Sequence, residues 1–81
     1  MTILVLSCGT RNKLIRFFKE TLAKRPEGGR VVAADCSPWA PALYEADAWY
    51  LVERMTEPGY LAHLLEICKK EGVNAVLPLF E

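Results

Sequence analysis

The chain has few cysteines, no long apolar run and no surplus of either charge. Its three cysteines, Cys8, Cys36 and Cys68, are odd in number and widely spaced, so they match neither a zinc-binding spacing nor a CxxC redox pair. No segment approaches the roughly 20 apolar residues of a transmembrane helix, and residues 1–6 lack the basic start of a secretory leader. We therefore expect a cytoplasmic protein with reduced thiols and no membrane partner.

The charge balance and the composition narrow the possible functions. Ten Lys and Arg residues against ten Asp and Glu give a formal net charge of zero. This argues against a nucleic-acid or anionic-membrane binder, whose affinity depends on a basic surplus. Hydrophobic residues make up 52% of the chain and charged residues 25%, as in a globular protein. A single domain of 81 residues is marginally stable without a crosslink, a partner or further chain.

Apolar runs and helical stripes alternate along the chain. Short apolar or aromatic runs predict four strands, at residues 3–6, 30–35, 49–52 and 75–80. Residues 13–24 and a segment after Thr56 carry apolar positions at helical spacing, and a short helical turn fits residues 42–46. Right-handed crossovers between these strands predict a three-layer Rossmann-like α/β domain over residues 1–81. Its four-stranded parallel sheet is expected in the order 3-2-1-4.

The second helix carries its own start and stop signals. Thr56 is expected to cap it, with Glu57 and Pro58 in its first turn. Gly72 supplies the stop at its C-terminal end. The buried stripe is predicted on Leu61, Leu64, Leu65 and Cys68. His63 falls on the opposite side and is expected on the surface.

In an open parallel sheet, ligands bind at the carboxyl ends of the strands, near the point where the strand order reverses. This places a crevice between the first and fourth strands, with residues 7–11, 35–37 and 78–81 beside it. Gly9 allows a tight turn with exposed N–H groups, the following helix presents the positive end of its dipole, and Arg11 can contact phosphate or carboxylate. This predicts an anion site. The alternative is a strand-to-helix turn with a solvated arginine, because the GxGxxG fingerprint is absent.

Two further side chains have both a chemical and a structural interpretation. Asp35 ends the second strand, where it would hold a ribose in a dinucleotide-binding domain, or else caps the next turn through Ser37 or the Pro38 segment. Cys8 lies near a helix N-terminus, which lowers the pKa of a thiol, but no base is placed to use it as a nucleophile. No metal site is indicated.

Three segments resemble one family. Residues 3–11, ILVLSCGTR, look like the ILVTSAGRR opening of ATP-grasp proteins similar to the carbamoyl-phosphate synthase large chain. Residues 35–47, DCSPWAPALYEAD, resemble that group's D-x-S-P-x-A-P-A-L-Y-x-A-D segment, and residues 58–60 and 64–71 resemble its next helix. Together these segments cover nearly the whole chain. They imply the N-terminal pre-ATP-grasp domain, a Rossmann-like lobe that precedes the ATP-binding lobes.

The resemblance also implies an activity for the parent protein. Such ligases use ATP to form an acyl phosphate, which an amine or similar nucleophile captures, and the N-terminal lobe lines the substrate side of the cleft. The expected substrate or anion contacts lie in two neighbouring loops, at Ser7, Gly9, Thr10, Arg11, Asp35, Ser37 and Pro38. Thr10 stands where the family often has a second arginine, which leaves less positive charge for an anion. ATP and Mg²⁺ are expected in the full-length parent, and no cofactor or catalytic residue is expected in this chain.

The length of the chain carries two further expectations. The ATP-binding lobes are absent from the 81 residues, so this polypeptide alone is expected neither to hydrolyse ATP nor to ligate anything. An apolar fourth strand at the sheet edge is a template for another copy, which predicts a homodimer or swapped assembly through residues 75–80. Two alternatives stay open: a free-standing anion- or nucleotide-binding module, and a self-associating interaction domain without a small ligand.

Overall fold

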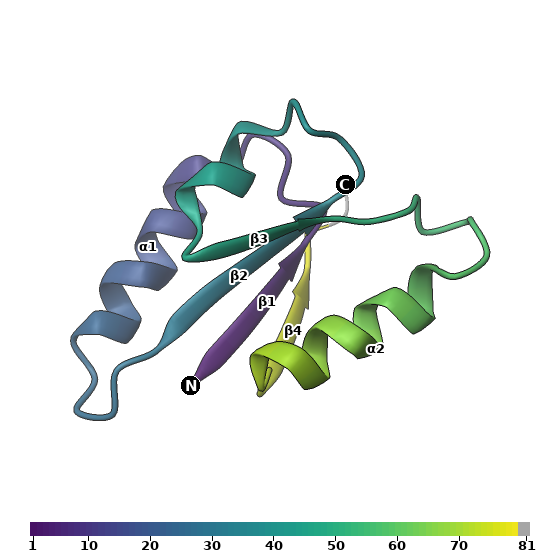
Figure 1. The fold of residues 1–81 in the computed structure, drawn as a ribbon. Coiled ribbons are helices and arrows are strands. Elements are labelled where there is room, and N and C mark those ends of the chain that lie inside the picture. The colour runs from purple at the N-terminus through teal and green to yellow at the C-terminus, as the bar shows by residue number, and fades with distance from the viewer. Residues whose placement is uncertain (80–81) are drawn as a thin grey trace.

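The computed structural model describes residues 1–79 and contains alternating strands and helices (Figure 1). The strands are β1 (Thr2–Leu6), β2 (Arg30–Asp35), β3 (Ala48–Leu51) and β4 (Ala75–Pro78). The helices are α1 (Asn12–Ala23), the short 3-10 helix η1 (Pro41–Glu45) and α2 (Tyr60–Glu71). No helix in this described part of the chain is long and apolar enough to cross a membrane. Phe80, the expected end of the fourth strand, lies outside the described residues.

All four strands are parallel and hydrogen-bonded in the order β3-β2-β1-β4. In the register of β1, Thr2 pairs with Arg30 of β2, and Ile3 pairs with Ala75 of β4. α1 and η1 cover one face of the sheet, and α2 covers the other (Figure 1). The three-layer Rossmann-like fold and the strand order predicted from the sequence are therefore confirmed.

Alternate residues of β1 and β2 contribute to two separate cores. The core under α1 and η1 includes Val5, Val31, Ala33, Ile15, Leu22 and Leu43. The core under α2 consists of Leu4, Leu6, Val32, Ala34, Leu64 and Ile67. Because successive side chains of a strand point to opposite faces, two cores require apolar residues at consecutive positions. This explains the uninterrupted apolar runs in the sequence.

α2 begins later than the sequence signals indicate. Its first residue is Tyr60, and its N-cap is Gly59, whose φ of 89° lies in the left-handed region. Thr56 lies in a turn ahead of the helix, so the prediction that it caps α2 is wrong. Pro58 disfavours helical geometry in the residue before it, and the helix starts only after the Pro58-Gly59 turn. At the other end, Gly72 stops the helix with a φ of 65°, as predicted.

The face that α2 buries also differs from the prediction. Leu64 and Ile67 are buried against the sheet, whereas Leu61 and Leu65 are 68% and 54% exposed. The predicted stripe is therefore wrong at Leu61 and Leu65, whereas Leu64 is buried and Cys68 packs against the same core as predicted. A second helical stripe, from Tyr60 through Leu64 and Ile67, has equally suitable spacing. The two stripes overlap in the sequence, and contact with the sheet selects the second one.

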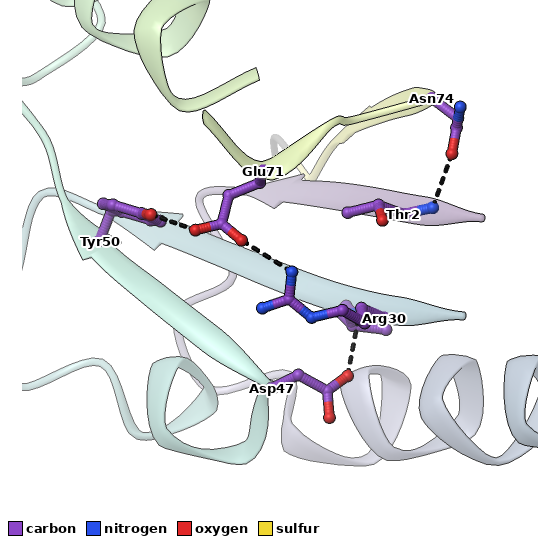
Figure 2. Close-up of polar contacts among 7 residues, drawn as sticks. Thr2, Arg30, Asp47, Tyr50, Glu71 and Asn74 are labelled. Atoms are coloured by element: carbon purple, nitrogen blue, oxygen red, sulfur yellow. Dashed lines mark hydrogen bonds and ion pairs between the residues drawn. The ribbon is translucent and has the colours of Figure 1, made fainter. Parts of the chain in front are cut away.

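A polar network joins the C-terminal end of α2 to two strands (Figure 2). Arg30 Nη1, at the start of β2, donates to Glu71 Oε1 at 2.8 Å, and the Tyr50 hydroxyl of β3 donates to Glu71 Oε2. Glu71 is the last residue of α2, so its side chain holds the helix end against the sheet. The hydrogen bond from Tyr50, followed by the bond from Arg30, lowers the pKa of Glu71.

Side-chain oxygens also accept backbone N–H groups where the strands begin (Figure 2). Asn74 Oδ1 accepts from the Thr2 N–H, and Asp47 Oδ2 accepts from the Val31 N–H, both at 2.8 Å. Asn74 directly precedes β4, which pairs with β1, and Asp47 directly precedes β3, which pairs with β2. Each contact therefore helps to set where an edge strand begins relative to its neighbour.

We predict that Glu71→Gln lowers the free energy of unfolding by about 1 kcal/mol at neutral pH, because the ion pair with Arg30 becomes a hydrogen bond from a charged donor to an uncharged amide. The pKa of Glu71 is lower in the folded state. The contribution is therefore complete above the unfolded-state pKa of about 4.3 and is lost as the pH falls through the folded-state value. Urea unfolding at several pH values measures this difference, which should vanish in acid. Glu66→Gln, on the exposed side of α2, is the control, and an equal loss in both variants would contradict the prediction.

Candidate functional site

β1 ends in a tight turn at the carboxyl edge, by which we mean the edge of the sheet where all four strands end. Ser7 has a φ of 56°, which is uncommon for residues other than glycine, and its N–H donates to Ala34 O at 2.9 Å. Gly9 follows with a φ of 52°, as a tight turn requires. The Arg11 N–H donates to Cys8 O at 2.9 Å and closes the turn. A non-glycine residue held in this conformation is often part of a binding site.

The Asp35 carboxylate joins the loops that follow β1 and β2. Its Oδ2 accepts the Gly9 N–H at 2.9 Å, and its Oδ1 accepts the Ser37 N–H at 3.1 Å. The second contact is the turn cap that was one of the two interpretations of Asp35. The first contact uses the Gly9 N–H within the protein, so this group does not point toward a ligand. The two predicted loops are thus held together at one place.

The loop after β2 has further internal contacts. Ser37 Oγ accepts the Trp39 N–H at 3.2 Å, and the Tyr44 hydroxyl of η1 donates to Pro38 O at 2.5 Å. Tyr44 also packs edge-on against Trp49, with 5.0 Å between the ring centroids. The Trp39 side chain itself is 88% exposed. Ser37 and Pro38 therefore lie in a loop whose shape is held by its own residues.

Thr10 and Arg11 lie at the start of α1. Both are exposed, and Arg11 is the N-cap of the helix. The Arg11 side chain makes no capping hydrogen bond to α1, and the first turn of the helix contains no acidic residue. The positive end of the helix dipole and the Arg11 charge thus lie at the carboxyl edge. The Ala42 N–H donates to Gly9 O at 3.1 Å, which attaches η1 to the same loop.

A pocket of about 320 Å³ opens at the carboxyl edge on the α2 side of the sheet. Its lining comes from the ends of β1, β2 and β3, the loop after β3 and the first residue of α2. The lining residues are Ser7, Ala34, Cys36, Val52, Glu53, Arg54, Met55, Thr56 and Tyr60. Of the residues predicted as a site, Ser7 alone is in this lining. Gly9, Asp35 and Ser37 support the pocket from the neighbouring loops through the contacts described above.

The site residues predicted from the sequence do not include residues 52–56 and Tyr60, which line the pocket. The reversal of strand order points to the space between β1 and β4, whereas this pocket lies beside the ends of β1, β2 and β3. One signal was available, because the loop after the third strand must also emerge at the carboxyl edge of a parallel sheet. That signal identifies the loop but not the side of the sheet on which it lies.

One hydroxyl group and one thiol group at the carboxyl edge have pKa values above their ordinary ones. Burial, followed by the charges of Asp35 and Cys36, raises the pKa of Tyr60, so its hydroxyl stays protonated in the pocket. Burial and the charge of Asp35 raise the pKa of Cys8 to about 11. Cys8 is also fully buried. A buried, protonated thiol is inert, so the structure does not support Cys8 as a nucleophile.

His63, which was predicted on the surface, is partly exposed and contacts another side chain. Its Nδ1 lies 2.7 Å from Glu53 Oε1, and its side chain is only 33% exposed. The rotation of α2 that buries Leu64 and Ile67 turns residue 63 toward the loop after β3. Within residues 1–79, no group of three His, Cys, Asp or Glu side chains is placed to hold a metal ion.

These features define a Rossmann-like α/β domain whose loops after β1, β2 and β3 surround a pocket at the carboxyl edge. The family model of the PylC-like N-terminal domain matches residues 3–81. The chain belongs to this family, which confirms the N-terminal pre-ATP-grasp domain predicted from the sequence. Comparison with curated proteins gives no match.

We predict that Asp35→Asn removes one of the two acceptors that join the loops and lowers the free energy of unfolding by about 1–2 kcal/mol. Amide exchange of Gly9 or Ser37 should become faster in NMR spectra. The pKa of Tyr60 should fall toward its ordinary value, because the charge of Asp35 helps to raise it. Ser37→Ala keeps both Asp35 contacts and is the control. Unchanged exchange at both amides in Asp35→Asn would show that the carboxylate does not hold the loops.

Proposed function

We propose that this domain forms the substrate side of an ATP-dependent carboxylate-amine ligase similar to carbamoyl-phosphate synthase. The observation that carries the proposal is membership of the PylC-like N-terminal domain family over residues 3–81. The pocket at the carboxyl edge supports it, because ligands of open parallel sheets bind there. In such a ligase, ATP converts a carboxylate into an acyl phosphate, and an amine then displaces the phosphate. This domain would bind and orient the acceptor or the carboxylate substrate.

The polar groups at the carboxyl edge suit an anionic or polar substrate. Arg11 and the N-terminus of α1 supply positive charge at the first loop. Ser7, Arg54 and the Tyr60 hydroxyl line the pocket. Because Asp35 already holds the neighbouring loops together, less conformational entropy is lost when a substrate binds. The domain would therefore contribute orientation and binding energy rather than a reacting group.

ATP and Mg²⁺ are proposed to bind to the ATP-grasp lobes of the parent protein. Within residues 1–79, no group of three His, Cys, Asp or Glu side chains that could hold a metal ion is found. We infer that the phosphoryl chemistry requires those lobes and that this domain has no activity by itself. The free thiols of Cys8, Cys36 and Cys68 are consistent with the proposed cytoplasmic location.

Arg11→Ala tests the proposed role in the ligase that contains this domain. We expect the KM for the substrate bound at the carboxyl edge to rise about tenfold or more, with the KM for ATP unchanged, because a charge-assisted contact is lost. Steady-state kinetics with each substrate varied in turn measure both constants. Lys13→Ala removes the same charge from the same helix start and is the control.

The isolated domain should release no phosphate from ATP and Mg²⁺. Metal-dependent turnover by the pure 81-residue chain would contradict the proposal, as would equal changes of both KM values in Arg11→Ala. A reading frame that continues downstream into an ATP-binding lobe would support it.

A free-standing anion-binding module is a second candidate function. The observation that favours it is the start of α1, where the helix dipole and the Arg11 charge lie together and the first turn contains no acidic residue. Calorimetric titration of the isolated domain with inorganic phosphate separates the two candidates. Phosphate binding that disappears in Arg11→Ala but persists in Lys13→Ala would favour the module.

We also propose that the domain self-associates through β4, either as a homodimer or as a swapped assembly. β4 is an edge strand, and its Val76 side chain is 48% exposed. An unpaired apolar edge can accept a strand from another copy. Sedimentation velocity over a range of concentrations should show an increasing mean mass, and Val76→Lys should abolish the increase. A monomer at every concentration would contradict this proposal, whereas a stable dimer that binds none of the probes would favour the interaction-domain alternative.

A further inference from the structure

The loop between β3 and α2, residues 52–59, forms much of the pocket wall. Its residues 52–56 all line the pocket. The loop is attached at its start, where the Val52 N–H donates to Asp35 O at 3.0 Å, and it contains a turn in which the Glu57 N–H donates to Arg54 O at 2.8 Å. The shape of the pocket therefore depends on where this loop lies relative to α2.

A side-chain contact joins this loop to α2. Glu53 Oε1 and His63 Nδ1 are 2.7 Å apart, and the two side chains are 35% and 33% exposed. An ionised carboxylate can only accept, so Nδ1 of His63 carries the proton and donates it. The hydrogen bond from His63 is the main cause that lowers the pKa of Glu53. The contact is therefore made at neutral pH.

Gly59 leaves room for the Glu53 carboxylate. A Cβ at Gly59 would lie 3.1 Å from Glu53 Oε2, and the φ of 89° is one that other residues rarely adopt. The His63 N–H donates to Gly59 O at 2.9 Å, so the carboxylate lies over the first turn of α2. That turn has no side-chain cap, and a negative charge is favourable at the N-terminus of a helix. Glu53 thus contacts α2 at a position where the charge and the available space both suit it.

We propose that Glu53 and His63 are positioning residues, which hold the 52–59 loop against the first turn of α2 and so set the pocket wall. The proposal rests on the proposed function only in treating the pocket as the substrate site. The other charged residues of the loop are Arg54 and Glu57, and the next charged residue of α2 after His63 is Glu66; all three are exposed. The contact is therefore one between a loop and a helix, and it involves neither core.

Amide hydrogen exchange of the full chain tests this proposal. In His63→Ala, exchange of the Glu57 amide, which closes the turn in the loop, should become about fivefold faster, while the Val32 amide in β2 should not change. The carboxyl pKa of Glu53, followed by NMR, should rise toward its ordinary value. His63→Asn should restore slow exchange, because its side-chain N–H lies where Nδ1 lies. Glu66→Ala is the matched control on the same helix.

Two results would overturn the proposal. One is unchanged exchange of the loop in both His63→Ala and Glu53→Ala. The other is an equal acceleration of the Glu57 and Val32 amides, which would mean that the pair stabilises the whole domain and does not position the loop. Glu53→Ala removes the acceptor and leaves α2 unaltered, so it tests the contact even where His63→Ala does not fold. No ligand is present in these measurements, so a failure of the pocket to bind substrate would count against the proposed function alone.

Discussion

β1 and β2 lie in the middle of the sheet and are buried on both faces. This burial determines where the helices and the edge strands pack. The adjacent residues Leu4 and Val5 point into different cores, so a helix is needed on each side of the sheet. Parallel strands can be joined only by crossovers: α1 and η1 lie in the crossovers on one face, and α2 lies in the crossover on the other. All four strands therefore end at one edge. The loops that carry polar groups meet there because the strands are parallel.

Much of the polar chemistry at the carboxyl edge holds the edge itself together. Both oxygens of Asp35 accept backbone N–H groups, and Glu53 is joined to His63. The hydroxyl groups of Ser7 and Tyr60 belong to residues that line the pocket. Loops that are ordered before a ligand binds lose little further freedom on binding. This is the property expected of a domain that provides one wall of an active site.

At the edge of the sheet where the strands begin, polar contacts hold α2 and the neighbouring strands in place without a covalent crosslink. Glu71 joins the end of α2 to β2 and β3, and Asn74 accepts an N–H of the strand next to its own. Within the described residues, no buried side-chain nitrogen or oxygen lacks a hydrogen-bond partner. A domain of 81 residues buries a smaller fraction of its surface than a larger one. Polar contacts that place α2 correctly on the sheet therefore matter more here than in a large core.

Local patterns in the sequence determined the fold class, the strand order and the family, because apolar runs, right-handed crossovers and the motifs at residues 3–11 and 35–47 are properties of short segments. The bounds of β2 and the stop of α2 at Gly72 follow from such patterns too. The buried face of α2 does not, because two overlapping stripes fit its spacing and contact with the sheet selects the one through Ile67. The pairing of Glu53 with His63 depends on that same rotation, and the side of the sheet on which the pocket opens depends on where the loop after β3 packs. They were decided only in the tertiary structure, where residues distant in the chain come into contact.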